Sequence, residues 1–243
     1  MSKVLEDSRT VFITLFIYSF DYLLTAFLLL IGLASAVMGL YSVVFRLIFF
    51  WTRCIFIMAW PGGLHISGSD NMESGRPYLI VTNHSSLFDI PAIMALQPNI
   101  AWLAKNHLFK IPVFGHLIRR LGCVPVERKN LIRAGREISF KAGGRIKNQS
   151  IGIFPEGTRT LDGNLLEFRR GFIRMFRNCR IDILPVTLNG FFSLKPKNRF
   201  VIHPGKKLEI IVHKPLTYME FSDDTDENIM NTVRQRILMD YKI

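Results

Sequence analysis

The chain has 243 residues and a formal net charge of +12 at pH 7, and 49% of its residues are hydrophobic. This length holds one large domain, or a medium domain with an appendage, and it excludes a fibrous or disordered chain. The positive charge suits an anionic membrane surface or phosphate-bearing substrates. We expect no binding to nucleic acid, because the sequence lacks zinc-ligand spacing, an RNP-like aromatic string and a basic region leading into a heptad repeat.

The first sixty residues predict a hydrophobic helical membrane anchor. Residues 22–45 form a run of 24 residues without a charge, longer than the roughly 20 that a helix needs to cross a bilayer core. A cleaved secretory signal is disfavoured because the apolar stretch is too long and its start is acidic. The anchor is either one spanning helix, or two helices that meet near Asp21 or within residues 32–39 and return to the same side. Arg46 and Arg53 place the remainder of the chain on the cytoplasmic face of the membrane.

From residue 61 onward, short apolar runs separated by turn residues predict strands that alternate with helices. We therefore expect an α/β domain over residues 61–243, with a mixed sheet flanked by helices, after an anchor over residues 1–60. The expected strands cover residues 78–82, 100–104, 123–126, 151–154, 183–188, 200–203 and 208–212. The expected helices cover residues 90–96, 113–121, 131–147, 168–178 and 226–239.

Polar residues follow four of the expected strands, at the ends where sheets of this class bind ligands. The first strand leads into Asn83 and His84, the second into Lys105, the third into Arg128, and the fourth into the segment 155–159. We expect these strand ends to converge on one site.

His84 and Asp89 are candidates for a catalytic pair. On a continuous helix, five steps turn through about 500°, so the two side chains would not meet. A turn is required, and Asp89-Ile90-Pro91 supplies one, since Asp is a good N-cap and Pro is tolerated in a first helical turn. The loop can then fold His84 back onto the Asp89 carboxylate, which holds the imidazole in the tautomer that takes a proton from an alcohol.

Two other interpretations of this loop stay open. In the plainer one, Asp89 caps a helix and His84 ends a strand, without any chemistry between them. In the other, Ser85 or Ser86 is a nucleophile; neither lies in a GxSxG elbow, so direct attack by a substrate hydroxyl is the simpler reaction.

The segment 154–159, Phe-Pro-Glu-Gly-Thr-Arg, combines a tight turn with groups that can hold a phosphate. Gly157 permits close backbone approach, and the Arg159 guanidinium can bind a phosphate through two hydrogen bonds. Alone, the segment could equally be an ordinary loop, but the cations Lys105 and Arg128 at neighbouring strand ends favour an anionic pocket. The arginines at 169, 170, 174 and 177 are interpreted as a solvated or membrane-facing stripe without a catalytic role.

These motifs resemble those of the 1-acyl-glycerol-3-phosphate acyltransferase family. Residues 83–89, Asn-His-Ser-Ser-Leu-Phe-Asp, resemble its first motif, a histidine and an aspartate separated by four residues, and residues 154–159 resemble its third motif without a change. Residues 105–128 resemble the stretch that leads to the second motif, and residues 184–186 resemble the fourth. The second motif departs from the family pattern, since residues 124–128 have proline within the strand and glutamate where aspartate is commoner.

The resemblance implies a membrane-bound enzyme that moves a fatty acyl chain from acyl-CoA or acyl-carrier protein to the free sn-2 hydroxyl of 1-acyl-glycerol-3-phosphate, giving phosphatidic acid. It implies His84 as the general base and Asp89 as the residue that orients it. It also implies that the phosphate of the acceptor is bound by Lys105, Arg128 and Arg159. The acceptor pocket would be formed by Glu156, Gly157 and Thr158.

We expect membrane lipid, lysophosphatidic acid and the acyl donor as partners, and no metal or other cofactor. The three cysteines, Cys54, Cys123 and Cys179, are widely spaced and lack a CxxC pairing, so neither a disulfide frame nor a metal cluster is indicated. Two alternatives stay open. The acceptor could be glycerol-3-phosphate, another lysophospholipid or a lyso amino-acid lipid, or the chain could be a catalytically silent protein that binds anionic lipid.

Overall fold

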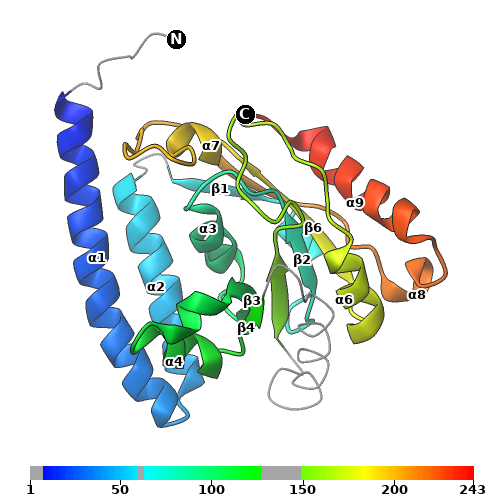
Figure 1. Ribbon diagram of the computed structural model, residues 1–243, viewed down its shortest axis with the longest axis horizontal. Helices are drawn as coiled ribbons and strands as arrows, with labels where there is room; N and C mark the ends of the chain where they lie inside the picture. The colour runs from blue at the N-terminus through cyan, green and yellow to red at the C-terminus, as the bar shows by residue number, and fades with distance from the viewer. Residues whose placement is uncertain (1–7, 60–62, 127–148) are drawn as a thin grey trace.

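The computed structural model describes residues 8–59, 63–126 and 149–243, and in these parts of the chain a seven-stranded sheet separates two layers of helices (Figure 1). One face is covered by α1 (Ser8–Val37), α2 (Tyr41–Ala59), α3 (Asp89–Leu96) and α4 (Phe114–Arg120). The other face is covered by α6 (Gly171–Cys179) and α9 (Asp226–Asp240). Four short helices connect these elements: η1 (Ser69–Asn71), η2 (Asn106–Lys110), α7 (Phe191–Leu194) and α8 (Tyr218–Phe221).

The sheet is mixed, as the sequence predicts. Its strand order is β1-β7-β6-β2-β5-β3-β4. Strands β6 and β7 pair antiparallel, and every other neighbouring pair is parallel. The strands are β1 (Leu64–Ser67), β2 (Leu79–Thr82), β3 (Ile100–Lys105), β4 (Val124–Val126), β5 (Ser150–Ile153), β6 (Ile183–Asn189) and β7 (Leu208–Val212).

The central strands β2, β5 and β6 are buried along their whole length. Their residues alternate between the two faces, so Ile80 packs in the core beneath α2 and α3, while Leu79 and Val81 pack in the core beneath α6 and α9. This explains why these strands read as continuous apolar runs. The carboxyl end of β2 therefore lies in the middle of the molecule, between the ends of β5 and β6.

Two strand assignments differ from the sequence-based prediction because distant partners decide them. β1 was not expected; its four residues form a strand by parallel pairing with β7. The expected strand at 200–203 is not a strand, because a side chain of α1 takes the place of a neighbouring strand. The Thr14 hydroxyl accepts from the Ile202 N–H at 3.1 Å; it donates to the Thr10 carbonyl at 2.8 Å and lies 3.4 Å from the Ile202 carbonyl. The expected helix 131–147 lies outside the described residues.

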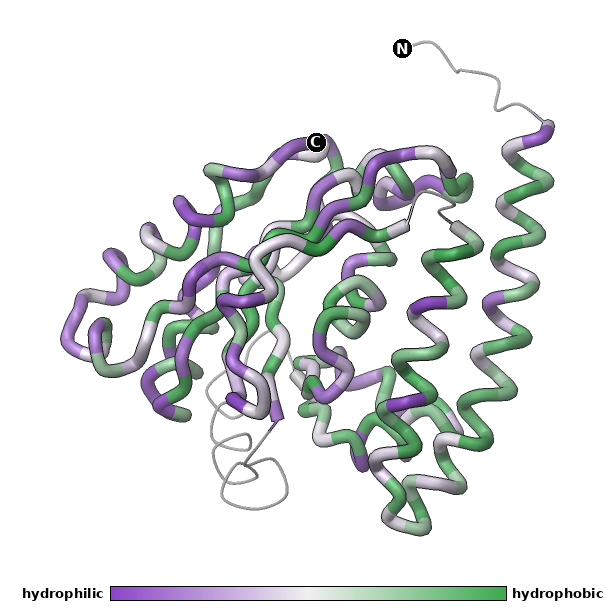
Figure 2. Tube along the Cα trace, turned by 180° about the vertical axis from the view of Figure 1, so that it is seen from behind, coloured by the Kyte–Doolittle hydropathy of each residue, from purple (hydrophilic) through white to green (hydrophobic). Residues whose placement is uncertain are grey.

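The N-terminal region forms two antiparallel helices, which turn within residues 38–40 at Gly39 (φ 77°). Of the two predicted arrangements, this is the helix pair that meets near residues 32–39, and Asp21 lies inside α1. Both helices are long and apolar enough to cross a membrane. Figure 2 shows hydrophobic residues along both of them, and their large exposed side chains indicate contact with lipid. These include Phe12, Phe16, Leu23, Phe27, Leu30 and Ile57.

The helix pair packs on the α/β part of the chain at both of its ends. Near the start of α1, the Tyr18 hydroxyl donates to the Phe200 carbonyl at 3.1 Å. Near the end of α1, the Arg120 guanidinium of α4 donates to the Ala36 carbonyl at 3.3 Å. The pair is therefore attached along its length and does not project away from the sheet.

Candidate active site

Asn83 fixes the end of β2 against β6. Its side-chain amide donates to the Leu188 carbonyl at 2.9 Å, and its side-chain oxygen accepts from the Leu188 N–H at 2.8 Å. Asn83 is buried, so its amide satisfies backbone groups that β2 no longer reaches. His84 consequently leaves the sheet at a defined point, at the carboxyl end of the central strand.

Three nitrogen atoms of the loop after β2 converge on one oxygen of Asp89. Asp89 Oδ2 lies 2.6 Å from the Ser85 backbone nitrogen, 2.8 Å from the Ser86 backbone nitrogen and 2.8 Å from His84 Nδ1. The contact between His84 and Asp89 that the sequence predicts is therefore present. The predicted capping role of Asp89 is wrong: Phe88 is at the N-cap position of α3, and the Asp89 carboxylate turns back onto the preceding loop.

This arrangement fixes the tautomer of His84. Because Oδ2 already accepts from the two serine N–H groups, it is an acceptor, and His84 Nδ1 carries the proton that it donates to Asp89. The lone pair of the neutral ring is then on Nε2, where it can take a proton from an alcohol. Asp89 is fully buried, so its negative charge acts on the imidazolium with little screening by water.

The serines of the loop are not placed as nucleophiles. Both Ser85 and Ser86 are buried. The Ser86 hydroxyl donates to the Lys195 carbonyl at 2.9 Å, and this hydrogen bond ties the loop to the segment after α7. Direct attack by a substrate hydroxyl is thus favoured over an acyl-serine intermediate.

A stack of three aromatic rings sets the plane of the His84 imidazole. The His84 and Phe154 rings are 3.8 Å apart between centroids and inclined by 16°, and the Phe154 and Trp102 rings are 5.3 Å apart and inclined by 18°. Trp102 lies against Gly152 of β5, where an added Cβ would come within 2.7 Å of the indole. The glycine in this strand therefore makes room for the stack.

Glu156 holds the backbone of His84. Its Oε1 accepts from the His84 N–H at 2.7 Å, and its Oε2 accepts from the Leu166 N–H at 3.0 Å. The His84 carbonyl accepts in turn from the Thr160 N–H at 3.0 Å. Burial raises the pKa of Glu156 to about 7, against the opposing effect of the two N–H groups. Both carboxylate oxygens of Glu156 therefore hold backbone groups, and one of these groups is the N–H of His84.

The turn after Glu156 presents cations beside the histidine loop. Gly157 has a φ of 70°, and an added Cβ would lie 3.1 Å from the Arg169 Nε atom. The Lys197 ammonium donates to the Thr158 hydroxyl at 2.8 Å and to the Arg159 carbonyl at 3.3 Å. Arg159 is half-buried. The turn therefore gathers three cationic side chains, from Arg159, Arg169 and Lys197.

Lys105, another predicted cation, is not part of this group. Lys105 ends β3, which is separated from β2 by β5, and its side chain is exposed. None of the contacts described above involves it. Arg128 lies outside the described residues. Of the three predicted phosphate ligands, the structure places Arg159 alone beside the histidine loop within the described part of the chain.

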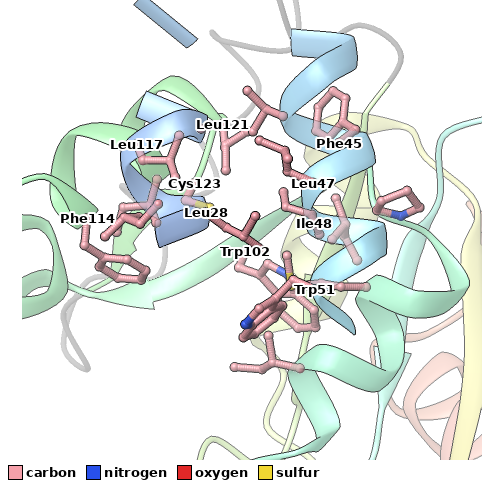
Figure 3. A pocket seen from close by; sticks show the side chains of 18 of the residues that line it. Leu28, Phe45, Leu47, Ile48, Trp51, Trp102, Phe114, Leu117, Leu121 and Cys123 are labelled. Carbon is pink, nitrogen blue, oxygen red and sulfur yellow. The ribbon is translucent and has the colours of Figure 1, made fainter. Parts of the chain in front are cut away.

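An apolar cavity of about 260 Å³ lies at the far end of the ring stack, between the helix pair and the sheet (Figure 3). Trp102 lines this cavity and connects it to His84 through Phe154. Its walls come from α1, α2, α3, β3 and α4, so the cavity exists only while the helix pair packs on the α/β part. Lining residues include Leu28, Phe45, Ile48, Leu117 and Cys123.

Sequence reasoning missed Phe154, Trp102 and Lys197. Phe154 belongs to a motif that was identified, but its ring contact with His84 spans 70 residues of chain and leaves no local pattern. An aromatic residue in each of two neighbouring strands is a weak signal that could have suggested the stack. Lys197 reaches the site because residues 195–197 pack beside Ser86, a contact that no local pattern in the sequence indicates.

Comparisons with known proteins agree with the geometry. A family model described as "Acyltransferase" matches residues 63–189. The 1-acyl-sn-glycerol-3-phosphate acyltransferase of Borreliella burgdorferi is 33% identical over 201 residues, which cover 79% of this chain and 78% of that protein. The chloroplastic 1-acyl-sn-glycerol-3-phosphate acyltransferase LPAT1 of Arabidopsis thaliana is 28% identical over 63% of this chain, which spans only 43% of that longer protein.

A solved structure is similar over nearly the whole chain. It is the crystal structure of the 1-acyl-sn-glycerophosphate (LPA) acyltransferase, PlsC, from Thermotoga maritima, with a TM-score of 0.79 and 28% sequence identity. The match covers 94% of this chain and 93% of that one. The similarity therefore includes the helix pair as well as the sheet.

Proposed function

The chain belongs to the acyltransferase family, and from this premise we propose that it transfers a fatty acyl chain from a thioester to the sn-2 hydroxyl of 1-acyl-glycerol-3-phosphate, giving phosphatidic acid. The observation that carries the proposal is the pairing of His84 with Asp89 at the end of β2. It supplies a base for an acceptor hydroxyl, and the relatives are named as acyltransferases whose acceptor is 1-acyl-sn-glycerol-3-phosphate.

The proposed step needs only the imidazole for proton transfer. His84 Nε2 takes the proton of the acceptor hydroxyl while the oxygen attacks the thioester carbon. The tetrahedral intermediate collapses, the carbon–sulfur bond breaks, and the imidazolium returns the proton to the leaving thiolate. Buried Asp89 stabilises the imidazolium that exists between these two events. We expect no cofactor, because a thiolate leaves readily and one base completes both proton transfers.

The cations on the turn after Glu156 would bind the acceptor phosphate. Arg159 offers a planar pair of donors, and Lys197 retains one N–H beyond those that it donates to Thr158 and Arg159. Lys105 and Arg128 remain candidates for the outer part of the same phosphate site. The ester-linked chain of the acceptor would then extend toward the lipid-facing helices.

The apolar cavity would receive the acyl chain of the donor. It starts at Trp102, whose ring stacks on Phe154, so an acyl chain within it would lead its thioester carbon toward His84. Both acyl-CoA and acyl-carrier protein present such a chain at the end of a phosphopantetheine arm. We retain both as candidate donors.

The helix pair would anchor the catalytic domain, residues 61–243, to the cytoplasmic face of the membrane. A helix of 30 residues is about 45 Å long, enough to cross a bilayer, but both ends of α1 contact the α/β part. A perpendicular crossing would pull that part into the lipid. The pair therefore fits into one leaflet, with Arg46 and Arg53 on the cytoplasmic side.

The test mixes purified, detergent-solubilised protein with acyl-CoA and 1-acyl-glycerol-3-phosphate and follows free thiol and phosphatidic acid together. Equal amounts of both products are expected. A parallel set of reactions replaces the donor with acyl-carrier protein and the acceptor with glycerol-3-phosphate, a lysophospholipid with a larger head group or a lyso amino-acid lipid. A preference for one of these acceptors would contradict the proposed substrate, and absence of thiol release with every pair would contradict acyl transfer.

A further inference from the structure

The loop between residues 160 and 166 holds the catalytic histidine without containing any predicted site residue. Its first N–H, from Thr160, donates to the His84 carbonyl, and its last N–H, from Leu166, donates to Glu156 Oε2. Glu156 Oε1 in turn accepts from the His84 N–H. A shift of this loop would therefore weaken the hydrogen bonds at both the N–H and the carbonyl of His84.

Asp162 shapes the loop from within. Its Oδ1 accepts from the Thr160 hydroxyl at 2.8 Å and from the Asn164 N–H at 3.0 Å, and its Oδ2 accepts from the Asn164 amide at 2.8 Å. These hydrogen bonds define a turn, but they do not attach it to the rest of the molecule. Gly163, at the tip, is buried and has a φ of 90°.

Two residues at the end of the chain, Tyr241 and Ile243, pack on the tip of this loop. The Tyr241 hydroxyl donates to the Gly163 carbonyl. An added Cβ on Gly163 would lie 2.9 Å from Ile243 Cγ2 and 3.0 Å from Phe192 Cδ1, so the tip is enclosed on that side. In Figure 1 the C-terminus lies beside the loop that follows β5.

These last residues are themselves fixed to the sheet. Asn189, at the end of β6, donates through its side-chain amide to the Asp240 carbonyl at 2.8 Å and accepts from the Lys242 N–H at 2.8 Å. Asn189 is buried, and α9 packs on β6 through Val233 and Ile237. The residues on either side of Tyr241 are therefore both hydrogen-bonded to the buried Asn189, and this fixes the backbone of Tyr241.

We infer that Tyr241 is a positioning residue of the active site: it clamps the 160–166 loop, and through Glu156 it fixes the backbone of His84. Burial, together with the charges of Glu156, Asp89 and Asp162, raises the pKa of Tyr241 to about 12, so its hydroxyl stays a hydrogen-bond donor. The residue lies outside the segment 63–189 that the family model matches. Only the expected change in kcat rests on the proposed function; the clamping of the loop does not.

The test is Tyr241→Phe, which removes the hydroxyl and keeps the ring. Loss of one neutral hydrogen bond is expected to lower kcat by about fivefold and to leave KM for both substrates unchanged. A merely structural role would lower thermal stability and leave the kcat of the folded protein unchanged.

Hydrogen–deuterium exchange of the peptide 156–166 tests the clamp independently of activity. We expect exchange in Tyr241→Phe to be about fivefold faster there, with wild-type exchange in β6. Gly163→Ala, which strains the loop tip, should have the same effects. Tyr218→Phe, on α8 with its ring against Phe176, is the matched control and should resemble the wild type.

Unchanged exchange in Tyr241→Phe would overturn the inference. So would faster exchange together with a wild-type kcat, because the loop would then move without affecting the histidine. A wild-type protein that forms no phosphatidic acid would remove the proposed function, and the exchange comparison would still decide whether Tyr241 fixes the loop.

Discussion

The two ends of the His84–Phe154–Trp102 stack are held in different ways. At the His84 end, directional hydrogen bonds fix the imidazole, its backbone N–H and its backbone carbonyl. At the Trp102 end, the cavity is bounded mainly by apolar side chains of helices and β3, and a hydrogen bond from Trp51 Nε1 to Thr25 Oγ1 at 2.8 Å joins α2 to α1 in its wall. The first region sets which atom accepts a proton, and the second sets how much space an acyl chain has. Changes in the first should affect turnover, and changes in the second should affect selectivity.

Asp89→Asn should have the largest effect, and it acts at the His84 end of the stack. The amide is uncharged, so it no longer stabilises the imidazolium, and its NH₂ group is buried in place of a carboxylate oxygen. We expect kcat to fall by roughly two to four orders of magnitude with a small change in KM. Steady-state thiol release, measured beside a melting curve, checks this. A folded variant within twofold of the wild-type kcat would remove Asp89 from the mechanism.

Arg159→Met tests the phosphate contact at the same end. Loss of a charge-assisted hydrogen bond should raise KM for 1-acyl-glycerol-3-phosphate by about tenfold or more and leave kcat nearly unchanged. Transfer to an uncharged 1-acyl-glycerol should not respond. Arg174→Met, exposed on α6, is the matched control. Equal losses with the charged and the uncharged acceptor would show that Arg159 does not bind the phosphate.

Ala104→Leu tests the apolar end. The larger side chain projects into the cavity, so long donors should lose relative to short ones, with a shift of about tenfold in the ratio of their kcat/KM values. With the donor chain length that the variant prefers, its turnover should be close to the wild-type rate. Ile57→Leu, on the exposed side of α2, is the control. An unchanged ratio would mean that the acyl chain binds elsewhere.

Glu156→Gln has the smallest effect and concerns stability. Burial raises the pKa of Glu156 from 4.5 to about 7, so the folded state retains a proton that the unfolded state has lost. The free energy of unfolding of the wild type therefore falls as pH rises from about 4.5 to about 7, by about 3 kcal/mol in total for this group. Urea unfolding at about pH 5 and about pH 8 should show this contribution in the wild type and lose it in Glu156→Gln. An equal pH dependence in both proteins would contradict the raised pKa.

The same contrast explains what the sequence could predict. His84 and Asp89 are five positions apart, and backbone geometry alone shows that they meet only across a turn. The order of apolar runs and turns likewise predicted the central strands, because their burial on both faces leaves a continuous pattern. These inferences needed no knowledge of distant contacts.

The parts of the fold and of the site that the sequence does not predict depend on contacts between residues far apart in the chain. Lys197 joins the turn after Glu156 because residues 195–197 lie beside Ser86. The backbone at Ile202 pairs with Thr14 of α1 instead of a strand. In the same way, the Glu156 carboxylate accepts from the N–H of a residue 72 positions earlier, and this contact leaves no local pattern. Residue type and spacing cannot reveal which distant groups will satisfy a buried polar atom.

The role of His84 as the base is tested most directly by the turnover of His84→Ala, measured as phosphatidic acid formed from acyl-CoA and 1-acyl-glycerol-3-phosphate at saturation. The imidazole is half-buried, so the variant should keep its melting temperature and its KM values. Turnover should fall by at least about a hundredfold at every pH, because the variant lacks the imidazole that takes the proton of the acceptor hydroxyl. A folded His84→Ala protein that turns over like the wild type would contradict the account.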